Sequence, residues 1–495
     1  MKYTNPVLKG FYPDPSVCFA DGKYYMVCSS FQYFPGVPLF ESEDLVNWTQ
    51  IGHVLTRKNQ IMLSHVESSG GVFAPTIRYH DGRFYMVTTN NSTQTNFYVY
   101  TDDIHKEWSD PVPVAQGGID PSLYFEDGRT FFISNGTDDS GIYGIVQCEI
   151  DIATGRKLTE SKCIWQGSGG RFIESPHMYK IHGEYYLMVA EGGTEYGHMI
   201  TYARGSSVWG PFQGYPDNPV LTNRNKAPYI IQGIGHGELV TDPYGDWHIL
   251  SLGFRQIHLW QAYHILGREV FLTPVTFHED GWFTAGKDKT TDESYEIKGD
   301  FLQKPLKTYS FETTDPAIDW CYLRHPYEEN YTFGAHDLTI YGTELTLEDV
   351  DSPTFIGFRQ RDFCFEMYAD LMVDHDEGGI TVYSTENEHY DLAVLRTLNE
   401  SQIVFKRNIG GIKHIEKAIP LPPSNTVRLI IKADFLTYSF YAVVDGKEVL
   451  LGTALSKYVS TEVSGGFTGV ILAFYAIGNN EVCIKDFQIK YLPQI

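Results

Sequence analysis

Short apolar and aromatic runs, each preceded by a turn signal, recur along almost the whole chain. Four of them follow a dipeptide that ends in glycine: residues 24–28, 84–88, 131–134 and 185–189. A strand-like run directly after an X-Gly dipeptide predicts a β-hairpin. No long segment has apolar residues at helical spacing, so the pattern predicts an all-β chain.

One sequence motif occurs five times in the first 250 residues. It consists of an anchor residue followed, seven or eight residues later, by a tight turn and an aromatic strand. The anchors lie 46 to 62 residues apart and are Asp14, Ala74, Asp120, Glu174 and, in a looser copy, His236. This period is about the length of one β-propeller blade. The sequence therefore predicts a five-bladed β-propeller whose anchors occupy equivalent places in successive blades.

A different pattern follows where the repeat stops, near Trp282. A polar, charged stretch leads into strands that alternate or run apolar, among them residues 363–368, 427–431 and 439–444. Alternation on many strands suggests two packed sheets, although a solenoid or a barrel fits the same pattern. We expect a propeller over residues 1–290, a linker over 291–304 and a jelly-roll β-sandwich over 305–495.

Charge and composition restrict the partners. The chain has 38 Lys and Arg against 62 Asp and Glu, a formal net charge of −24. Such a surface repels phosphate backbones and anionic headgroups, so we expect neither nucleic acid nor a membrane as partner. Aromatic residues make up 15% of the chain, which either β-propensity or stacking on sugar rings explains.

Cysteine usage and the amino terminus bear on location. The seven cysteines form no CxxC pair and no zinc spacing, as expected of reduced core cysteines. The first residues lack the apolar run of a signal peptide. Both observations favour a cytoplasmic protein, although a secreted chain trimmed of its leader would look identical. The oligomeric state stays open, with a homo-oligomer among the options.

Three of the five anchors are carboxylates. Equivalent residues of propeller blades converge on one axis, so Asp14, Asp120 and Glu174 would share a pocket. Like charges raise one another's pKa, and proteins tolerate this mainly where chemistry needs it. Cleavage between sugars needs one protonated carboxylic acid and one ionised carboxylate. Strand capping by Asx and Ser turns explains any single anchor but not three in register.

The motifs around the anchors resemble glycoside hydrolase family 43 over residues 5 to 283. The resemblance rests on motifs taken together, at residues 5–8, 10–16, 29–31, 34–37, 42–48, 73–76, 118–122, 174–177 and 235–237. The region after them resembles the concanavalin-like sandwich of the β-xylosidase and α-L-arabinofuranosidase branch. The resemblance implies an inverting single displacement in which Asp14 is the general base, Glu174 the general acid and Asp120 the residue that tunes and orients the acid.

The resemblance also implies substrate-binding roles. Arg268 matches a position whose guanidinium contacts the terminal sugar, and Phe31 matches an aromatic residue of the sugar pocket; the alternatives are a solvated charge and ordinary core packing. His236 matches a histidine that in many members faces a calcium ion or water on the axis. It could equally be a buried histidine that ties blades together. Phe73 departs from the Trp of many β-xylosidases, which leaves the sugar preference open.

These observations predict an exo-acting glycosidase that needs no cofactor for its chemistry. Its substrates would be oligosaccharides from hemicellulose such as xylan, from which it would release terminal α-L-arabinofuranosyl or β-D-xylosyl units. We expect a loop of the second domain to block one end of the cleft. The alternatives are a non-catalytic carbohydrate-binding propeller and a retaining β-fructosidase, whose signature motifs are absent from this chain.

Overall fold

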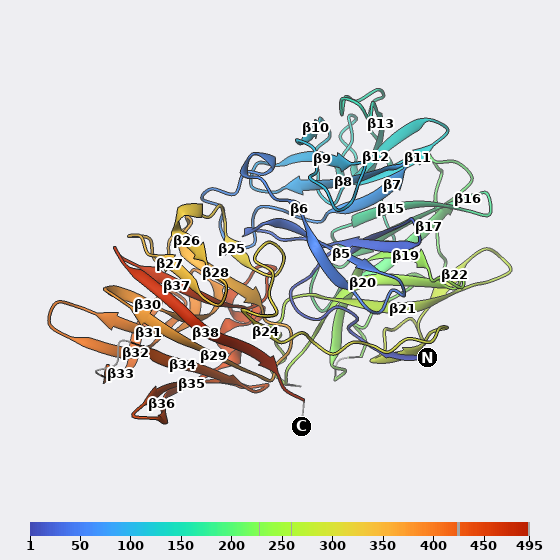
Figure 1. Cartoon of the computed structure of the whole chain (residues 1–495). Helices are drawn as coiled ribbons and strands as arrows, with labels where there is room; N and C mark the ends of the chain where they lie inside the picture. Colours follow the sequence, from blue (N-terminus) through green and yellow to red (C-terminus); the bar gives the residue numbers. More distant parts are fainter. Residues whose placement is uncertain (227, 259, 423–425, 494–495) are drawn as a thin grey trace.

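The computed structural model describes residues 1–226, 228–258, 260–422 and 426–493 (Figure 1). Its strands form five four-stranded sheets, two eight-stranded sheets and a two-stranded ribbon. The short helical elements are η1 (Lys58–Gln60), η2 (Glu328–Asn330), η3 (Ser456–Val459) and α1 (Thr461–Ser464). The all-β prediction is confirmed.

The five four-stranded sheets are the blades of a propeller. Blade 1 holds β2 (Ser16–Ala20), β3 (Lys23–Val27), β5 (Gly36–Ser42) and β6 (Thr49–Leu55). Blade 2 holds β7 (Thr76–His80), β8 (Arg83–Asn90), β9 (Thr95–Thr101) and β10 (Val112–Val114). Blade 3 holds β11 (Ser122–Glu126), β12 (Arg129–Thr137), β13 (Tyr143–Ile150) and β14 (Lys162–Trp165). Blade 4 holds β15 (Glu174–Ile181), β16 (Glu184–Glu191), β17 (Met199–Gly205) and β18 (Gln213–Gly214). Blade 5 holds β19 (Ile231–Thr241), β20 (Trp247–Arg255), β21 (Glu269–Phe277) and β22 (Phe283–Ala285).

The repeated X-Gly dipeptides form the turns between the first two strands of the blades. In blade 1, Asp21 and Gly22 have φ of 49° and 81°, and they alone separate β2 from β3. Blades 2 to 4 repeat this geometry at residues 81–82, 127–128 and 182–183. Two consecutive residues with positive φ define the turn that matches the twist of paired strands. The hairpins expected from the sequence are therefore present.

The two eight-stranded sheets build the second domain, a β-sandwich. One contains β26 (Tyr331–Phe333), β27 (Leu338–Tyr341), β38 (Glu481–Tyr491), β29 (Phe365–Val373), β34 (Val427–Ala433), β35 (Thr437–Val444) and β36 (Lys447–Leu455), with β24 (Tyr309–Ser310) also paired to β38. The other contains β33 (Ile412–Pro420), β32 (Ser401–Ile409), β31 (Glu388–Arg396), β30 (Asp376–Thr385), β37 (Ile471–Ile477), β28 (Thr354–Arg359), β25 (Cys321–Leu323) and β4 (Tyr33–Phe34). Every second residue of β29 is buried, as expected for a strand that faces a core on one side.

The two domains pack tightly against each other. β4 comes from the propeller segment of the chain but pairs with β25 of the sandwich. A shared apolar cluster includes Phe11 and Phe31 of the propeller and Tyr383 and Tyr475 of the sandwich. Residues 294–296, which we expected in the linker, form β23 (Ser294–Glu296) and pair with β1 (Lys2–Thr4). One face of the sandwich is therefore a partner of the propeller and not a free surface.

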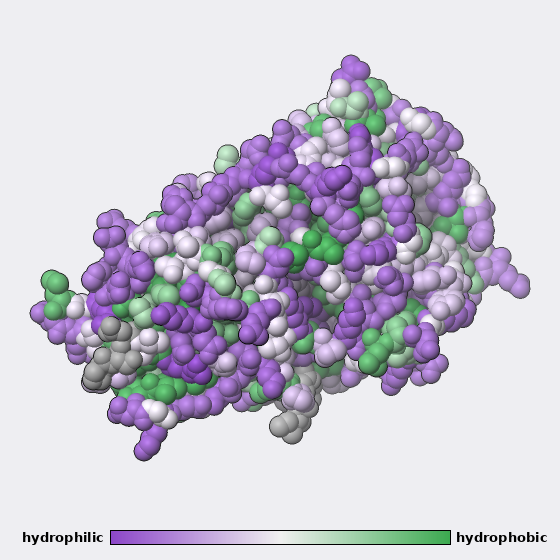
Figure 2. All heavy atoms as spheres, viewed as in Figure 1, coloured by the Kyte–Doolittle hydropathy of each residue, from purple (hydrophilic) through white to green (hydrophobic). Residues whose placement is uncertain are grey.

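The face of the molecule seen in Figure 2 is mostly polar. Figure 2 shows hydrophilic residues over most of the visible face, with hydrophobic residues only in small groups. Among the residues that the structure describes, no helix has the length and apolar character needed to cross a membrane.

Candidate active site

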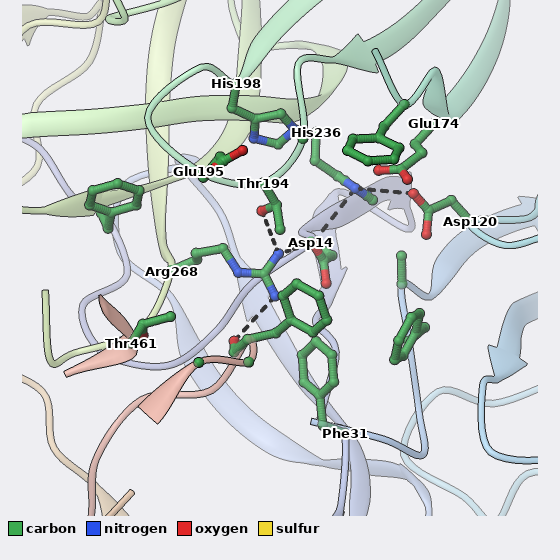
Figure 3. Close-up of a pocket in the computed structure, with 18 of the residues that line it drawn as sticks. Asp14, Phe31, Asp120, Glu174, Thr194, Glu195, His198, His236, Arg268 and Thr461 are labelled. Carbon is green, nitrogen blue, oxygen red and sulfur yellow. Dashed lines mark hydrogen bonds and ion pairs between the residues drawn. The ribbon is translucent and has the colours of Figure 1, made fainter. Parts of the chain in front are cut away.

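One pocket of about 570 Å³ gathers all seven residues singled out in the sequence (Figure 3). The propeller supplies these seven: Asp14, Phe31, Phe73, Asp120, Glu174, His236 and Arg268. The sandwich supplies Thr461, Glu462 and residues 465–467, and Arg268 Nη2 donates a hydrogen bond across the domain boundary to the Phe467 carbonyl at 3.3 Å. The pocket therefore has walls from both domains.

The anchors lie at the innermost strands, which contact one another around the axis. Asp14 and Asp120 precede β2 and β11, Glu174 opens β15, and His236 lies within β19. Asp14, Asp120 and His236 have φ of 57°, 52° and 43°. Non-glycine residues adopt such left-handed conformations at a cost and mostly where the surrounding structure holds them. Three of the five anchors thus share an unusual backbone geometry as well as a place in the repeat.

Asp14 is a buried carboxylate surrounded by positive and polar groups. It accepts hydrogen bonds from Ser29 Oγ at 2.5 Å and Arg268 Nη1 at 3.0 Å, and His236 Nδ1 lies 3.6 Å away. Burial alone would raise its pKa, but Arg268, His236 and Ser29 together hold the pKa below its usual value. Asp14 is therefore the ionised member of the three anchor carboxylates.

In contrast to Asp14, both Asp120 and Glu174 have a pKa above the usual value. Burial and the negative charge of Asp14 raise the pKa of Glu174 to about 7. Burial, followed by the charges of Glu174 and Asp14, raises the pKa of Asp120 well above its usual value, although the Ser175 N–H donates to Asp120 at 3.1 Å. Because two interacting acids release their protons as a pair, the two carboxyls retain at least one proton near neutral pH. The pocket thus combines an ionised carboxylate with a protonated carboxylic acid.

Aromatic rings surround Arg268. Its guanidinium carbon lies 5.6 Å from the ring centre of Phe31 and 5.7 Å from that of Phe467. Phe73 completes the group, with its ring centre 5.4 Å from that of Phe31. Arg268 is only 5% exposed, so it is not a solvated charge, and Phe31 both lines the pocket and belongs to the domain interface.

Comparison with known proteins decides the family. The family model described as "Glycosyl hydrolases family 43" matches residues 3–283, more than half of the chain. The chain belongs to glycoside hydrolase family 43. Residues 308–490 match the "Beta xylosidase C-terminal Concanavalin A-like domain". Both resemblances seen in the sequence are confirmed, and the chain is a family 43 glycoside hydrolase.

Individual relatives cover nearly the whole of this family 43 chain. The "Non-reducing end alpha-L-arabinofuranosidase BoGH43B" of Bacteroides ovatus is 37% identical over 97% of this chain and 92% of its own length. The "Xylosidase/arabinosidase" of Butyrivibrio fibrisolvens is 34% identical over 96% of each chain. Among solved structures, "Bacteroides ovatus Xyloglucan PUL GH43B" superposes with a TM-score of 0.93 at 35% identity, covering 99% of this chain and 100% of its own.

The residues around His236 test whether the calcium ion suggested by the family resemblance fits this site. Among the described residues, no group of three or more His, Cys, Asp or Glu side chains is arranged to hold a metal ion. The ring of His177 lies beside that of His236, with the centres 6.3 Å apart. Arg78 donates to His177 Nδ1 at 3.0 Å and forms a buried ion pair with Glu238. Calcium prefers six to eight oxygen ligands, and a guanidinium between the inner strands repels a cation, so this set of residues does not fit calcium.

The pocket residues that come from the sandwich could not be identified individually from the sequence. The best example is Phe467, whose backbone N–H donates to Ser69 Oγ of the propeller at 2.8 Å. Gly466 has φ of 77°, and a Cβ there would lie 2.3 Å from Ser69 Oγ, so glycine permits this docking. The only available signal was the glycine-rich stretch at residues 465–469. The loop that carries Thr194, Glu195 and Tyr196 was missed as well.

Proposed function

We propose that this family 43 hydrolase removes terminal α-L-arabinofuranosyl and β-D-xylosyl units from the non-reducing ends of hemicellulose-derived oligosaccharides. The observation that carries the proposal is the composite pocket, in which the sandwich segment around Phe467 lies against the sugar-binding candidates Arg268 and Phe31. A pocket walled in this way suits the end of a sugar chain better than its middle. The relatives named for arabinofuranosidase and xylosidase activity support the choice of sugars.

The electrostatics of the pocket support one assignment of roles. Asp14, held ionised by Arg268, takes a proton from the attacking water, and Glu174 gives its proton to the departing glycosidic oxygen. Asp120 would tune and orient the acid, as the family resemblance implies; its carboxylate accepts the backbone N–H of Ser175, the residue that follows Glu174. The water attacks opposite the leaving group, so the anomeric configuration inverts, as is typical of the family.

Phe73 supports activity on both sugars. A phenyl ring is smaller than an indole, and this ring lies against Phe31 and Phe467 at the aromatic wall of the pocket. The extra space suits the exocyclic hydroxymethyl group of a furanose, while a xylopyranosyl unit, an isomer without that group, still reaches Arg268. We therefore expect both activities, with the arabinofuranoside preferred.

We propose that the reaction needs no calcium. His236 has a pKa lowered to about 4 by burial, with the charge of Arg268 adding to the effect and Asp14 opposing it. A neutral His236, with Nδ1 3.6 Å from Asp14 and 3.8 Å from Asp120, separates the two carboxylates. Treatment with EDTA should therefore leave kcat/KM unchanged; a loss restored by calcium would contradict this.

Kinetics on two nitrophenyl glycosides test the proposal. The purified chain should cleave both the α-L-arabinofuranoside and the β-D-xyloside, and Asp14→Asn should lower kcat/KM on both by about 10²- to 10⁴-fold. Proton NMR of the first-formed sugar should show the inverted anomer. Binding of sugar without turnover, or an unimpaired Asp14→Asn variant, would contradict the proposal.

A further inference from the structure

A chain of ion pairs, buried except at Lys9, crosses the domain boundary close to the pocket. Asp362, in the turn between β28 and β29 of the sandwich, is 5% exposed. Its carboxylate accepts hydrogen bonds from Lys9 Nζ at 2.6 Å and from Arg255 Nη1 at 3.1 Å. Arg255 uses its other edge for Glu269, with Nε and Nη2 at 2.8 and 2.9 Å from the two carboxylate oxygens. One sandwich carboxylate therefore connects two separate propeller segments.

Glu269 extends this chain to the Asp14–Arg268 pair. It is fully buried, follows Arg268 directly in sequence, and accepts the backbone N–H of Gly10 at 2.9 Å. The Arg268 carbonyl accepts the N–H of Tyr12 at 3.0 Å. The backbone that carries Asp14 and the backbone that carries Arg268 are thus bonded to each other at two points beside their ion pair.

The same turn of the sandwich holds the Asp14 segment from its other side. Arg361 Nε donates to the Lys9 carbonyl at 3.1 Å. Gly10 has φ of 91°, and a Cβ there would lie 2.9 Å from the Gln360 carbonyl oxygen, so the two backbones meet at glycine distance. The segment from Lys9 to Asp14 is therefore held between β21 of the propeller and a turn of the sandwich.

We propose that Asp362 is a positioning residue for catalysis: through Lys9 on one side and Arg255 with Glu269 on the other, it holds Asp14 against Arg268 so that Asp14 stays ionised. Asp362 does not line the pocket and touches no substrate, so it acts through other residues. This inference rests on the proposed role of Asp14 as the base. It gives the sandwich a second task besides supplying a pocket wall.

The direction in which the acidic limb of the pH–kcat/KM profile moves distinguishes a positioning role of Asp362 from a direct effect of its charge on Asp14. Removing the negative charge of Asp362 would by itself lower the pKa of a neighbouring carboxyl group such as Asp14. Loosening Arg268 from Asp14 would raise the pKa of Asp14, because the nearby guanidinium is the main group that lowers it. The acidic limb of the pH–kcat/KM profile reports this pKa in the free enzyme.

The test compares pH profiles of the full-length wild type, Asp362→Asn and Asp391→Asn. Asp391 is a matched control, since it is a buried sandwich carboxylate bonded to Thr381 and His389 of the same domain. We expect Asp362→Asn to move the acidic limb to higher pH by about half a unit or more and to lower kcat/KM at the optimum about tenfold. Asp391→Asn should lower the thermal unfolding midpoint but leave the limb in place.

Asp362→Glu provides a second variant should Asp362→Asn not fold. It keeps the negative charge but adds a methylene group that displaces the carboxylate from Lys9 and Arg255, so we expect a smaller shift in the same direction, without any change of charge. A limb that stays in place or moves to lower pH would overturn the proposal. Full activity of Asp14→Asn would instead overturn the assignment of the base, whatever the Asp362 variants show.

Discussion

The propeller and the sandwich contribute to the same pocket in different ways. The propeller supplies every titratable group assigned to the chemistry, and these groups come from equivalent places in a repeated unit: Asp14, Asp120, Glu174 and His236. The sandwich supplies single residues from loops, such as Phe467 in the wall and Asp362 behind it. Symmetry thus places the reacting groups, while an asymmetric partner closes and aligns the pocket.

The tight packing of the two domains follows from these different contributions. A propeller axis brings carboxylates together, but it does not by itself keep one of them ionised and another protonated. Arg268 makes that distinction, and Arg268 is held by contacts to both domains: Asp14 and Thr194 on the propeller side and the Phe467 carbonyl on the sandwich side. The second domain is therefore part of the electrostatic arrangement of the pocket.

Glu174→Ala removes the proposed general acid, which the propeller supplies. Of the substitutions below, we expect it to lower activity most. On natural disaccharides we expect kcat/KM to fall by about 10²- to 10⁴-fold, because a poor leaving group needs the proton. On nitrophenyl glycosides the loss should be much smaller. In the wild type, activity on disaccharides should decline as the pH rises through about 7, where Glu174 loses its proton, and the variant should lack this limb. Equal losses on both substrates would contradict the role of the acid.

Phe467→Ala removes the aromatic side chain that the sandwich contributes to the pocket wall. The ring lies over Arg268 and packs against Phe31, so its loss should cost about 1–2 kcal/mol of substrate binding. That corresponds to roughly a tenfold higher KM with kcat little changed. Phe19→Ala, which removes an exposed ring on the outside of the propeller, is the control. An unchanged KM would show that the sandwich wall does not touch the substrate.

Phe73→Trp enlarges an aromatic side chain that the propeller contributes to the pocket wall. Of the three substitutions, we expect it to change activity least. An indole in the gap beside Phe31 should narrow the space left for a furanose. We expect the ratio of kcat/KM for the two nitrophenyl glycosides to shift toward the xyloside by roughly three- to tenfold. A shift toward the arabinofuranoside would mean that residue 73 does not set the sugar preference.

Much of the architecture could be predicted because many residues carry the same signal. The X-Gly turns and aromatic strands recur in successive blades, so the repeat was visible even though its fifth copy is looser and lacks the paired positive φ at Tyr244. The anchors inherited their equivalent positions from that repeat. The domain boundaries at 290 and 304 stay a prediction, since β23 of the expected linker pairs with the amino-terminal strand β1.

The all-β class, the blade period and the convergence of three carboxylates follow from the sequence alone, because each arises from a pattern that is local or periodic along the chain. The identity of the ionised carboxylate follows from tertiary contacts, since it depends on Arg268, 254 residues from Asp14. Tertiary contacts also bring Asp362 to Lys9 across 353 residues and Phe467 to the pocket. Such contacts arise from the docking of two unlike surfaces, and no spacing along the chain encodes where two surfaces meet.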